Sequence, residues 1–243
     1  MSEFSFRELD EEGLETLEAI SKANRFNQWM FDRINPYCKG KILEIGSGIG
    51  NISKYHVAAG NDICLTDIRD NYIQFLENKF IDSPADIFKL DIVHEDFDTK
   101  FSSHLESYDT VFALNVVEHI KNHELAIQNI HKILKKDGHI IILVPAYQAL
   151  HNSLDVALEH YRRYTSGSLS KLINSQGFEL IKTNYFNAAG MAGWWFTGNI
   201  LKKKTIPSGQ MKIYNSLVPA FKILDKVVLN KVGLSTICVA KKI

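Results

Sequence analysis

A glycine-rich turn after a short apolar strand constrains this chain more than any other feature. Residues 41–51 read KILEIGSGIGN, with glycines at Gly46, Gly48 and Gly50. Glycine lacks a Cβ and tolerates positive φ, so this turn can reverse tightly and leave the N–H groups that open the next helix free for a ligand. Glu44 adds a carboxylate two residues before the first glycine. The segment therefore predicts a loop that lets a ligand touch the backbone.

The spacing of the glycines separates two classes of ligand. The dinucleotide fingerprint G-x-G-x-x-G would place its third glycine at position 51, which is Asn51. Here the third glycine comes one residue earlier, and the pattern E-x-G-x-G-x-G, which Glu44 opens, resembles the first motif of the Rossmann-like S-adenosylmethionine (SAM) methyltransferases. The resemblance implies a loop that wraps the methionine end of SAM. A turn that needs glycine only for its geometry remains the alternative.

Acidic residues lie at the ends of the next two strand-like runs. The first run, NDICLTD, ends in Asp67, about 20 residues beyond the loop, where a carboxylate in a nucleotide-binding fold accepts the ribose hydroxyls. The second run, DIFKLDI, ends in Asp91 and Ile92. The resemblance implies that Asp91 binds the adenine amino group, that the backbone of Ile92 meets the ring, and that Ile68 belongs to the same site. Each aspartate taken alone could be a strand terminator, since aspartate is common in turns.

A fourth strand-like run, residues 108–114, leads into the sequence NVVEH at residues 115–119. In the methyltransferases that this chain resembles, the segment closes over the cofactor and faces the methyl acceptor. The resemblance implies that Asn115 lies near the cofactor. It also implies that Glu118 and His119 lie near the cleft.

Strands and helices alternate along the chain, which implies a parallel sheet. A helix is predicted from about Asn122 to Lys136, because its apolar residues recur at i, i+3, i+4 and i+7. A last strand is predicted over residues 234–241. The resemblance implies an α/β fold with a doubly wound, seven-stranded, mostly parallel sheet of order 3-2-1-4-5-7-6, whose last strand is antiparallel.

We expect a single domain, since a doubly wound sheet with a substrate cap fits 243 residues without a second core. Its predicted parts are an N-terminal helical lid at residues 1–38, a core at residues 39–186 and 232–243, and a helical cap inserted at residues 187–231. An insertion at that point can reach over the edge of the sheet where the ligands bind.

The densest polar and aromatic stretch, PAYQALHNSLDVALEHYRRYT, follows the fifth strand, where acceptor pockets are usually built. SAM already carries an activated methyl group, so the enzyme must hold a nucleophile in line with it, and a base is needed only for a weakly acidic hydroxyl or a protonated amine. We predict His160 and His119 as the catalytic residues. In the alternative interpretation, Glu159 and Arg163 pair on a helix and His160 is a packed side chain. The predicted acceptor-binding residues are Tyr147, His151, Tyr161 and Arg163.

Whole-chain composition argues against several other classes. The cysteines, Cys38, Cys64 and Cys238, are scattered and indicate a reduced, cytoplasmic protein, and no metal site is expected. The first residues are acidic and lack an apolar run, so no signal peptide is expected. No window reaches the roughly 18 apolar residues of a membrane span. The net charge of zero and the lack of a nucleic-acid motif argue against a nucleic-acid partner.

The charge is distributed unevenly along the chain. Leu201 to Ile243 contain nine lysines and one acidic residue, Asp225, and the aromatic residues Trp194, Trp195 and Phe196 lie just upstream. Together these features indicate a surface for an anionic membrane or a lipid-like substrate. A solvated lysine face over an ordinary capping helix is the alternative.

The predicted function is therefore SAM-dependent methyl transfer, at oxygen, to a small or lipid-like acceptor, with S-adenosylhomocysteine as the product. The stretch after the fifth strand and the ending GLSTICVAKK resemble a group of bacterial SAM-dependent methyltransferases. Two alternatives remain open. One is a non-catalytic protein that binds SAM or docks on a membrane, and the other is an NAD-dependent oxidoreductase.

Overall fold

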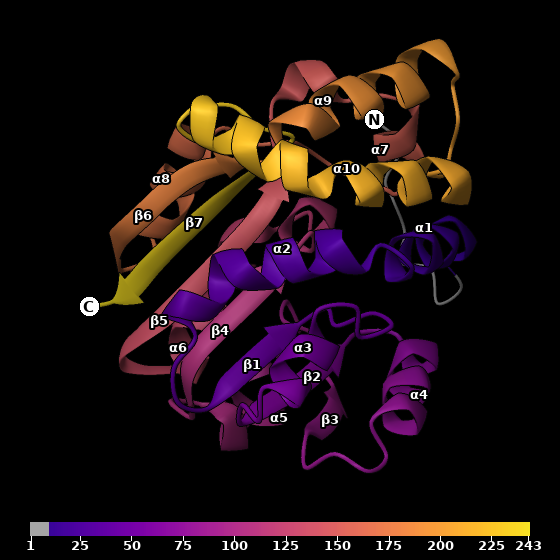
Figure 1. Ribbon diagram of the computed structural model, residues 1–243. Coiled ribbons are helices and arrows are strands. Elements are labelled where there is room, and N and C mark those ends of the chain that lie inside the picture. Colours follow the sequence, from indigo (N-terminus) through magenta and orange to yellow (C-terminus); the bar gives the residue numbers. More distant parts are fainter. Residues whose placement is uncertain (1–9) are drawn as a thin grey trace.

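A seven-stranded mixed sheet forms the centre of the molecule, and the computed structural model describes residues 10–243 (Figure 1). The start of the predicted lid, residues 1–9, lies outside the described residues. Neighbouring strands follow the order β3-β2-β1-β4-β5-β7-β6. β1 to β5 are parallel, and β7 runs antiparallel to both β5 and β6. The predicted fold class and strand order are confirmed. The strands are β1 Ile42–Ile45, β2 Ile63–Asp67, β3 Asp86–Lys89, β4 Tyr108–Leu114, β5 Leu134–Pro145, β6 Phe178–Phe186 and β7 Ser235–Lys242.

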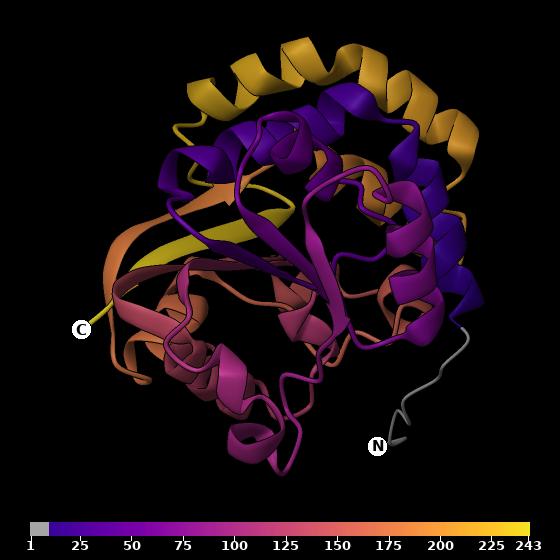
Figure 2. The same ribbon diagram turned by 90° about the horizontal axis from the view of Figure 1, so that it is seen from below.

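Helices cover both faces of the sheet. α5, α6 and α8 pack on one face, and α2, α3, α4 and α10 pack on the other. α2 and α10 lie side by side, as the view from below shows (Figure 2). The α-helices are α1 Glu11–Ser21, α2 Asn24–Ile34, α3 Ser53–Ala58, α4 Asp70–Lys79, α5 Phe97–Lys100, α6 His123–Ile133, α7 Ser153–Ala157, α8 Ser166–Asn174, α9 Ala188–Trp195 and α10 Ser208–Val227. Shorter helical turns are η1 Asn35–Tyr37, η2 Ser102–His104, η3 Val117–His119, η4 Gln148–Leu150 and η5 Phe196–Ile200.

The central strands are apolar on both faces, as expected for a sheet that helices cover on each side. In β5, Ile140, Ile142 and Val144 point into the cluster beneath α5, α6 and α8, while Ile141 and Leu143 point into the opposite cluster. This alternation follows from the two-residue period of a strand. The result is two apolar layers, one on each side of a single sheet.

The helix predicted to end at Lys136 ends earlier, because the sheet begins sooner. α6 stops at Ile133, and Leu134 is already paired with Tyr108 of β4 and is fully buried. Asp137 then takes a positive φ of 63°. Pairing with β4 therefore overrides the helical pattern over the last turn.

The segments that follow the parallel strands meet at one edge of the sheet, because the carboxyl ends of parallel strands point the same way. A Cβ on Gly46, after β1, would lie 2.4 Å from the Val116 side chain, after β4. α1 lies across the glycine-rich loop: Asn51 donates to the carbonyl of Leu17 at 2.9 Å, and a Cβ on Gly48 would lie 3.0 Å from the Leu17 side chain. The predicted cofactor-binding residues all lie in, or shortly after, β1 to β4.

The insertion before β7 forms α9, η5 and α10, and η5 packs against α7 at the same edge. Ser153 in α7 donates to the carbonyls of Gly198 and Lys203, both at 2.8 Å. A Cβ on Gly198 would lie 2.1 Å from the Asn152 side chain, so only glycine permits this approach. In residues 10–243, no helix is both long and apolar enough to cross a membrane.

Candidate active site

The glycine-rich loop has the backbone that its sequence predicts. Gly46, Gly48 and Gly50 have φ values of 73°, 53° and 72°, in the region that favours glycine. Glu44 is buried in β1 and accepts a hydrogen bond from the Ser53 hydroxyl at the start of α3. Burial raises the pKa of Glu44 to about 7, against the effect of the Ser53 hydrogen bond. Glu44 therefore joins the strand to the helix and supports the loop from beneath.

Asp67 lies against this loop. One carboxylate oxygen accepts the Gly48 N–H at 2.9 Å and the other accepts the Arg69 N–H at 3.1 Å. These contacts fix the orientation of the carboxylate. Each oxygen retains a second lone pair, so Asp67 can still accept from a pair of hydroxyls.

The remaining residues predicted to contact SAM lie at the ends of the neighbouring strands. Asp91 is partly buried and accepts the Val93 N–H at 3.0 Å, and Ile92 is buried. Ile68 is half-buried beside Asp67. Asn115 is exposed, with a positive φ of 55° that turns its side chain out of the line of β4. The loop, the acidic residues and Asn115 thus lie at, or shortly after, the carboxyl ends of β1 to β4, which are neighbours in the sheet.

An aspartate and a histidine form a buried pair beside this edge. Asp155, in α7, is fully buried and lies 2.7 Å from Nδ1 of His160. Asp155 also accepts from Arg163 Nε at 2.7 Å and from the indole N–H of Trp194 at 3.2 Å. Burial opposes ionisation of Asp155, but the bonds from His160 and Arg163 outweigh it and lower its pKa to about 2. The carboxylate therefore stays ionised and orients the imidazole.

Glu118 and His119, in η3, complete this group. The rings of His119 and His160 meet edge to face with centroids 4.6 Å apart. Glu118 is fully buried, and burial raises its pKa to about 8. His119 is an exposed residue, but desolvation by the surrounding protein and then the charge of His160 hold its pKa well below 6.5. At neutral pH the group therefore presents uncharged imidazole.

Comparison with known proteins identifies the class of this site. Residues 3–183 match the family described as "Methyltransferase domain". The chain belongs to this methyltransferase family. The positive-φ glycines bring the backbone of the loop beside the Asp67 carboxylate, which can still accept from hydroxyls, so the residues present fit the cofactor. The methyltransferase is thus an enzyme that uses SAM, as the sequence predicted.

Solved structures share the fold of the methyltransferase. A SAM-dependent methyltransferase from Archaeoglobus fulgidus gives a TM-score of 0.57 at 18% identity, over 89% of this chain and 94% of that one. A SAM-dependent methyltransferase from Thermotoga maritima gives a TM-score of 0.62 at 14% identity, over 93% of this chain and 94% of that one. Phosphoethanolamine N-methyltransferase 2 from Haemonchus contortus, solved with SAM, gives 0.58 at 17% identity, over 89% and 52%.

Two curated relatives are much longer proteins. Polyketide synthase PksR from Bacillus subtilis is 27% identical over 156 residues, which are 53% of this chain and 6% of that protein. The hybrid PKS-NRPS synthetase opdA from Penicillium oxalicum is 25% identical over 171 residues, which are 66% of this chain and 3% of that protein. The methyltransferase thus matches one small part of each. The comparisons give no support to an NAD-dependent oxidoreductase or to a non-catalytic protein.

The predicted acceptor residues fall into two groups in the methyltransferase. Tyr147 stacks on Tyr185 with centroids 5.0 Å apart, and His151 Nε2 lies 3.2 Å from the His160 carbonyl. Tyr161 is half-buried in the same segment. Arg163, in contrast, is buried and bonded to Asp155 and to the Ala146 carbonyl (3.0 Å). We therefore assign Arg163 to the positioning of Asp155.

The alternative interpretation is wrong in placing Glu159 and Arg163 on a helix, but His160 is a packed side chain, 5% exposed, as that alternative expects. α7 ends at Ala157, and Glu159 takes a positive φ of 59°. The chain then turns so that Arg163 and His160 both reach back to Asp155. The sequence does not predict the pairing of Asp155 with His160. The two residues are only five positions apart, but it is the turn at Glu159 that brings their side chains together. The contact of Trp194 with Asp155 is not predicted either, because the fold brings it from 39 residues further along the chain.

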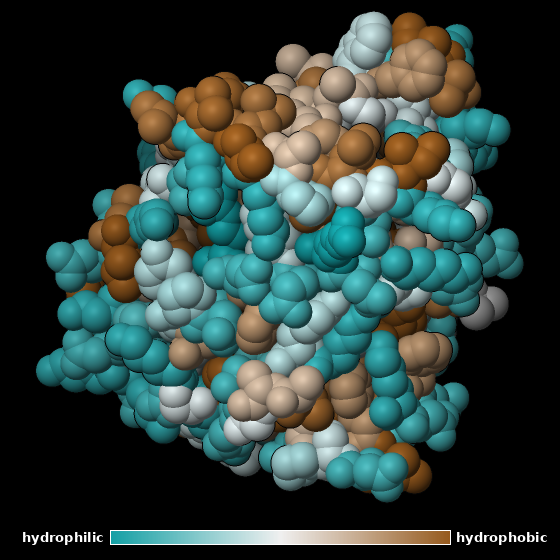
Figure 3. Space-filling model, viewed as in Figure 1, coloured by the Kyte–Doolittle hydropathy of each residue, from teal (hydrophilic) through white to brown (hydrophobic). Residues whose placement is uncertain are grey.

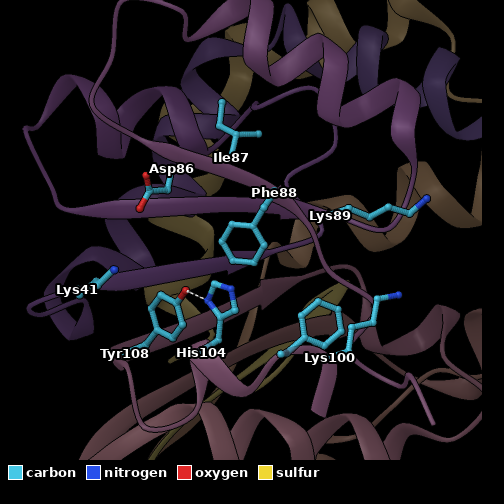
Figure 4. A pocket seen from close by; sticks show the side chains of 9 residues that line it. Lys41, Asp86, Ile87, Phe88, Lys89, Lys100, His104 and Tyr108 are labelled. Atoms are coloured by element: carbon cyan, nitrogen blue, oxygen red, sulfur yellow. Dashed lines mark hydrogen bonds between the residues drawn. The ribbon is translucent and has the colours of Figure 1, made fainter. Parts of the chain in front are cut away.

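A pocket of about 520 Å³ opens elsewhere on the methyltransferase (Figure 4). It is lined by Lys41 before β1, by Asp86 at the start of β3 and by Tyr108 at the start of β4. Phe88 stacks on His104 at 4.4 Å, and His104 Nδ1 lies 2.7 Å from the Tyr108 hydroxyl. Since three of the lining residues mark the amino ends of strands, away from the glycine-rich loop, we do not assign SAM to this pocket.

Proposed function

We propose that the methyltransferase transfers the methyl group to a hydroxyl oxygen of a lipid-like acceptor at an anionic membrane surface. One observation carries this proposal. The cap, whose outer surface is apolar and flanked by lysines, is hydrogen-bonded through Trp194 to the carboxylate that orients His160.

The outer surface of the cap supports the lipid part of the proposal. Apolar side chains gather over α9 and α10 at the top of the molecule (Figure 3). α10 has two apolar faces: Met211, Val218 and their neighbours face the core, while another face lies outward. The outward stripe has helical spacing, with exposed fractions of 66%, 46%, 39% and 71% at Ile213, Leu217, Leu224 and Val227. Further exposed apolar residues of the cap and its C-terminal loop are Trp195, Phe196, Ile200, Leu201, Ile223, Leu229 and Val232.

The charge of the cap supports an anionic membrane. Lys202, Lys203 and Lys204 are exposed in the loop before α10, and Lys212 and Lys226 are exposed on the helix. An apolar stripe with flanking lysines is the pattern by which a helix lies in the interface of an anionic bilayer. We use the name cap surface for these five lysines together with the exposed apolar residues of α10, the rest of the cap and its C-terminal loop given above.

The chemistry of the cleft supports a hydroxyl acceptor. SAM supplies an activated methyl group, so the protein must position the acceptor oxygen and assist the loss of its proton. Asp155 fixes Nδ1 of His160, which leaves Nε2 as the nitrogen available to the cleft. His119 lies against the same ring. We propose that these two imidazoles, with Glu118 beneath them, activate the acceptor hydroxyl.

Vesicle flotation tests the membrane part of the proposal. The protein is expected to float with vesicles that contain phosphatidylglycerol, to float less as salt rises, and to stay behind with pure phosphatidylcholine. Replacing both Ile213 and Leu217 by serine should reduce flotation at least tenfold. Ile81→Ser is the matched control, because Ile81 is 76% exposed outside the cap surface. Equal flotation of all three proteins would contradict the proposal.

Labelled SAM tests the acceptor. Incubation with a lipid extract and SAM carrying a ¹³C methyl group is expected to give a methylated lipid whose label has the chemical shift of an O-bound methyl carbon. His160→Ala should abolish this product while SAM binding persists. A label bound to nitrogen or carbon, or found only in water-soluble products, would overturn the proposed acceptor.

A further inference from the structure

We infer that Glu118, His119 and His160 hold a divalent cation at the acceptor side of the cleft. Each of these side chains offers one ligand atom, and the three atoms lie within 4.8 Å of one another. They come from two separate segments, η3 and the loop after α7, that the fold brings together. No short metal-binding motif joins residues so far apart in the sequence, which explains why sequence analysis expected no metal.

Glu118 is the observation that points to a ligand. Its side chain is fully buried, and within residues 10–243 neither of its carboxylate oxygens has a hydrogen-bond partner. A buried carboxyl group without a hydrogen-bond partner is costly whether or not it is ionised, and native proteins rarely retain one unless a water or a bound ion satisfies it. Burial raises the pKa of Glu118 and the charge of Arg163 lowers it, but Arg163 donates hydrogen bonds to Asp155 and to the Ala146 carbonyl instead. A bound cation would give Glu118 the partner that it lacks.

Both imidazoles are held as metal-binding histidines are. Histidine ligands commonly donate their second N–H to a carboxylate or to a backbone carbonyl, which fixes the ring and the nitrogen that faces the metal. His160 has Asp155 as this partner at 2.7 Å. The ring of His119 has a hydrogen bond with the backbone of Leu158 as this second support. The outer supports of the proposed site are therefore already in place.

The donor set selects the kind of cation. Two imidazole nitrogens and one carboxylate suit Zn²⁺, Mn²⁺, Fe²⁺ or Co²⁺, whereas Ca²⁺ and Mg²⁺ prefer oxygen ligands alone. In Zn²⁺ sites such ligands close to about 2.0–2.2 Å from the metal. Because His119 is exposed, a fourth position remains open toward the cleft. That position can take an oxygen ligand.

The role of the cation rests on the proposed function. A hydroxyl oxygen of the acceptor would bind at the open position, and the charge of the cation would lower its pKa. The proton leaves to water through the open side, the oxygen attacks the methyl carbon, and the carbon–sulfur bond breaks to release S-adenosylhomocysteine. If His119 and His160 bind the cation, the cation, and not the two imidazoles, promotes loss of the hydroxyl proton.

Cobalt(II) titration of the full chain tests the site without any acceptor. After removal of metals with EDTA, the protein is expected to bind one Co²⁺ with visible d–d absorption, and Zn²⁺ should displace it. Glu118→Gln, which keeps the shape of the side chain, should weaken binding at least 100-fold. Asp155→Asn should weaken it about 10–100-fold, as loss of an outer-shell partner does. His94→Ala, outside the cluster, is the control and should bind as the wild type does.

Thermal unfolding provides a second readout that separates a metal site from a structural one. Zn²⁺ should raise the Tm of the wild type and of His94→Ala, but not that of Glu118→Gln. Folding of Glu118→Gln is checked by its circular dichroism. The inference is overturned if wild-type protein shows no saturable Co²⁺ binding, or if Glu118→Gln binds as tightly. Since the titration uses no acceptor or vesicles, its failure leaves the proposed methyl transfer standing, and failure of the lipid assay leaves the metal site standing.

Discussion

Trp194 donates its indole N–H to Asp155, over 3.2 Å, from a position 39 residues further along the chain. The same indole lies under the Arg163 guanidinium, 4.8 Å from the ring centroid. One tryptophan of the cap therefore contacts both residues that hold His160 in place. The position of the cap and the orientation of the imidazole are structurally joined.

Trp194→Phe removes this hydrogen bond and keeps most of the packing. A hydrogen bond to a charged group contributes about 1.5–3 kcal/mol, so the free energy of unfolding should fall by roughly 1.5 kcal/mol. Urea denaturation of the wild type and the variant measures the change. Trp195→Phe is the matched control, because Trp195 is 47% exposed and its replacement should change stability by less than about 0.5 kcal/mol. Equal losses in both variants would show that the bond to Asp155 contributes nothing.

Gly48→Ala tests whether the loop requires glycine for ligand binding. Gly48 has a φ of 53°, its N–H donates to Asp67, and an added Cβ would press on Leu17. SAM affinity, measured by calorimetry, should fall about tenfold or more, which corresponds to about 1.4 kcal/mol. Gly60→Ala is the control for backbone strain alone, since Gly60 has a φ of 71° and open space around it. It should lose about 1–2 kcal/mol of stability and bind SAM normally. Normal SAM binding by Gly48→Ala would remove the loop from the site.

Asp67→Asn should weaken the binding of SAM and of S-adenosylhomocysteine about 10–100-fold, because a charged acceptor for the ribose hydroxyls is lost. Side-by-side calorimetric titrations with both compounds and with NAD measure this, and NAD should give no binding heat with either protein. Asp62→Asn, an exposed aspartate just before β2, should bind as the wild type does. If Asp67→Asn kept full affinity, the ribose assignment would be wrong.

His56 should make the stability of the protein depend on pH. It is fully buried in α3, stacked on Phe112 at 5.1 Å, and burial lowers its pKa to about 4. Below about pH 6.5 the unfolded chain takes up a proton that the folded protein cannot bind, so stability falls as pH drops toward 4 and then levels off. The lost contribution is roughly 3 kcal/mol.

His56→Gln checks this contribution. Glutamine does not titrate and can still accept from Asn61, which lies 2.9 Å from His56 Nδ1. Urea denaturation at several pH values between 7 and 4 should show a smaller loss of stability for the variant, by about the amount given above. Parallel curves for the two proteins would mean that His56 is protonated in the folded state.

Sequence patterns predict the sheet of this protein well, because each strand is specified by residues close together in the chain. The run from Tyr108 to Leu114 was predicted with its observed bounds, and the buried face of α6 lies where its period places it. The order of the strands came from the resemblance, since no local pattern specifies which strands become neighbours. The early end of α6 was not predicted, because pairing of Leu134 with Tyr108 decides it.

The group around His160 shows what local patterns cannot predict. His160 and His119 were predicted for the cleft, but Asp155 and the contact of Trp194 were not. These contacts depend on the turn at Glu159 and on where the end of α9 places Trp194. The sequence predicts that Arg163 binds the acceptor, but in the structure its carboxylate partner is the buried Asp155 of the protein itself. Burial, which a single sequence does not report, decides between the two roles.

The place of β7 between β5 and β6 has a consequence for the order in which the protein can fold during synthesis. β6 is made before the whole cap, and β6 has no neighbour in the sheet until β7 has been made. A ribosome therefore produces the apolar helices of the cap while the edge of the sheet beneath them is still unpaired. Such intermediates are prone to aggregation. The edge that the cap covers is therefore completed only when β7, the last strand of the chain, has been made.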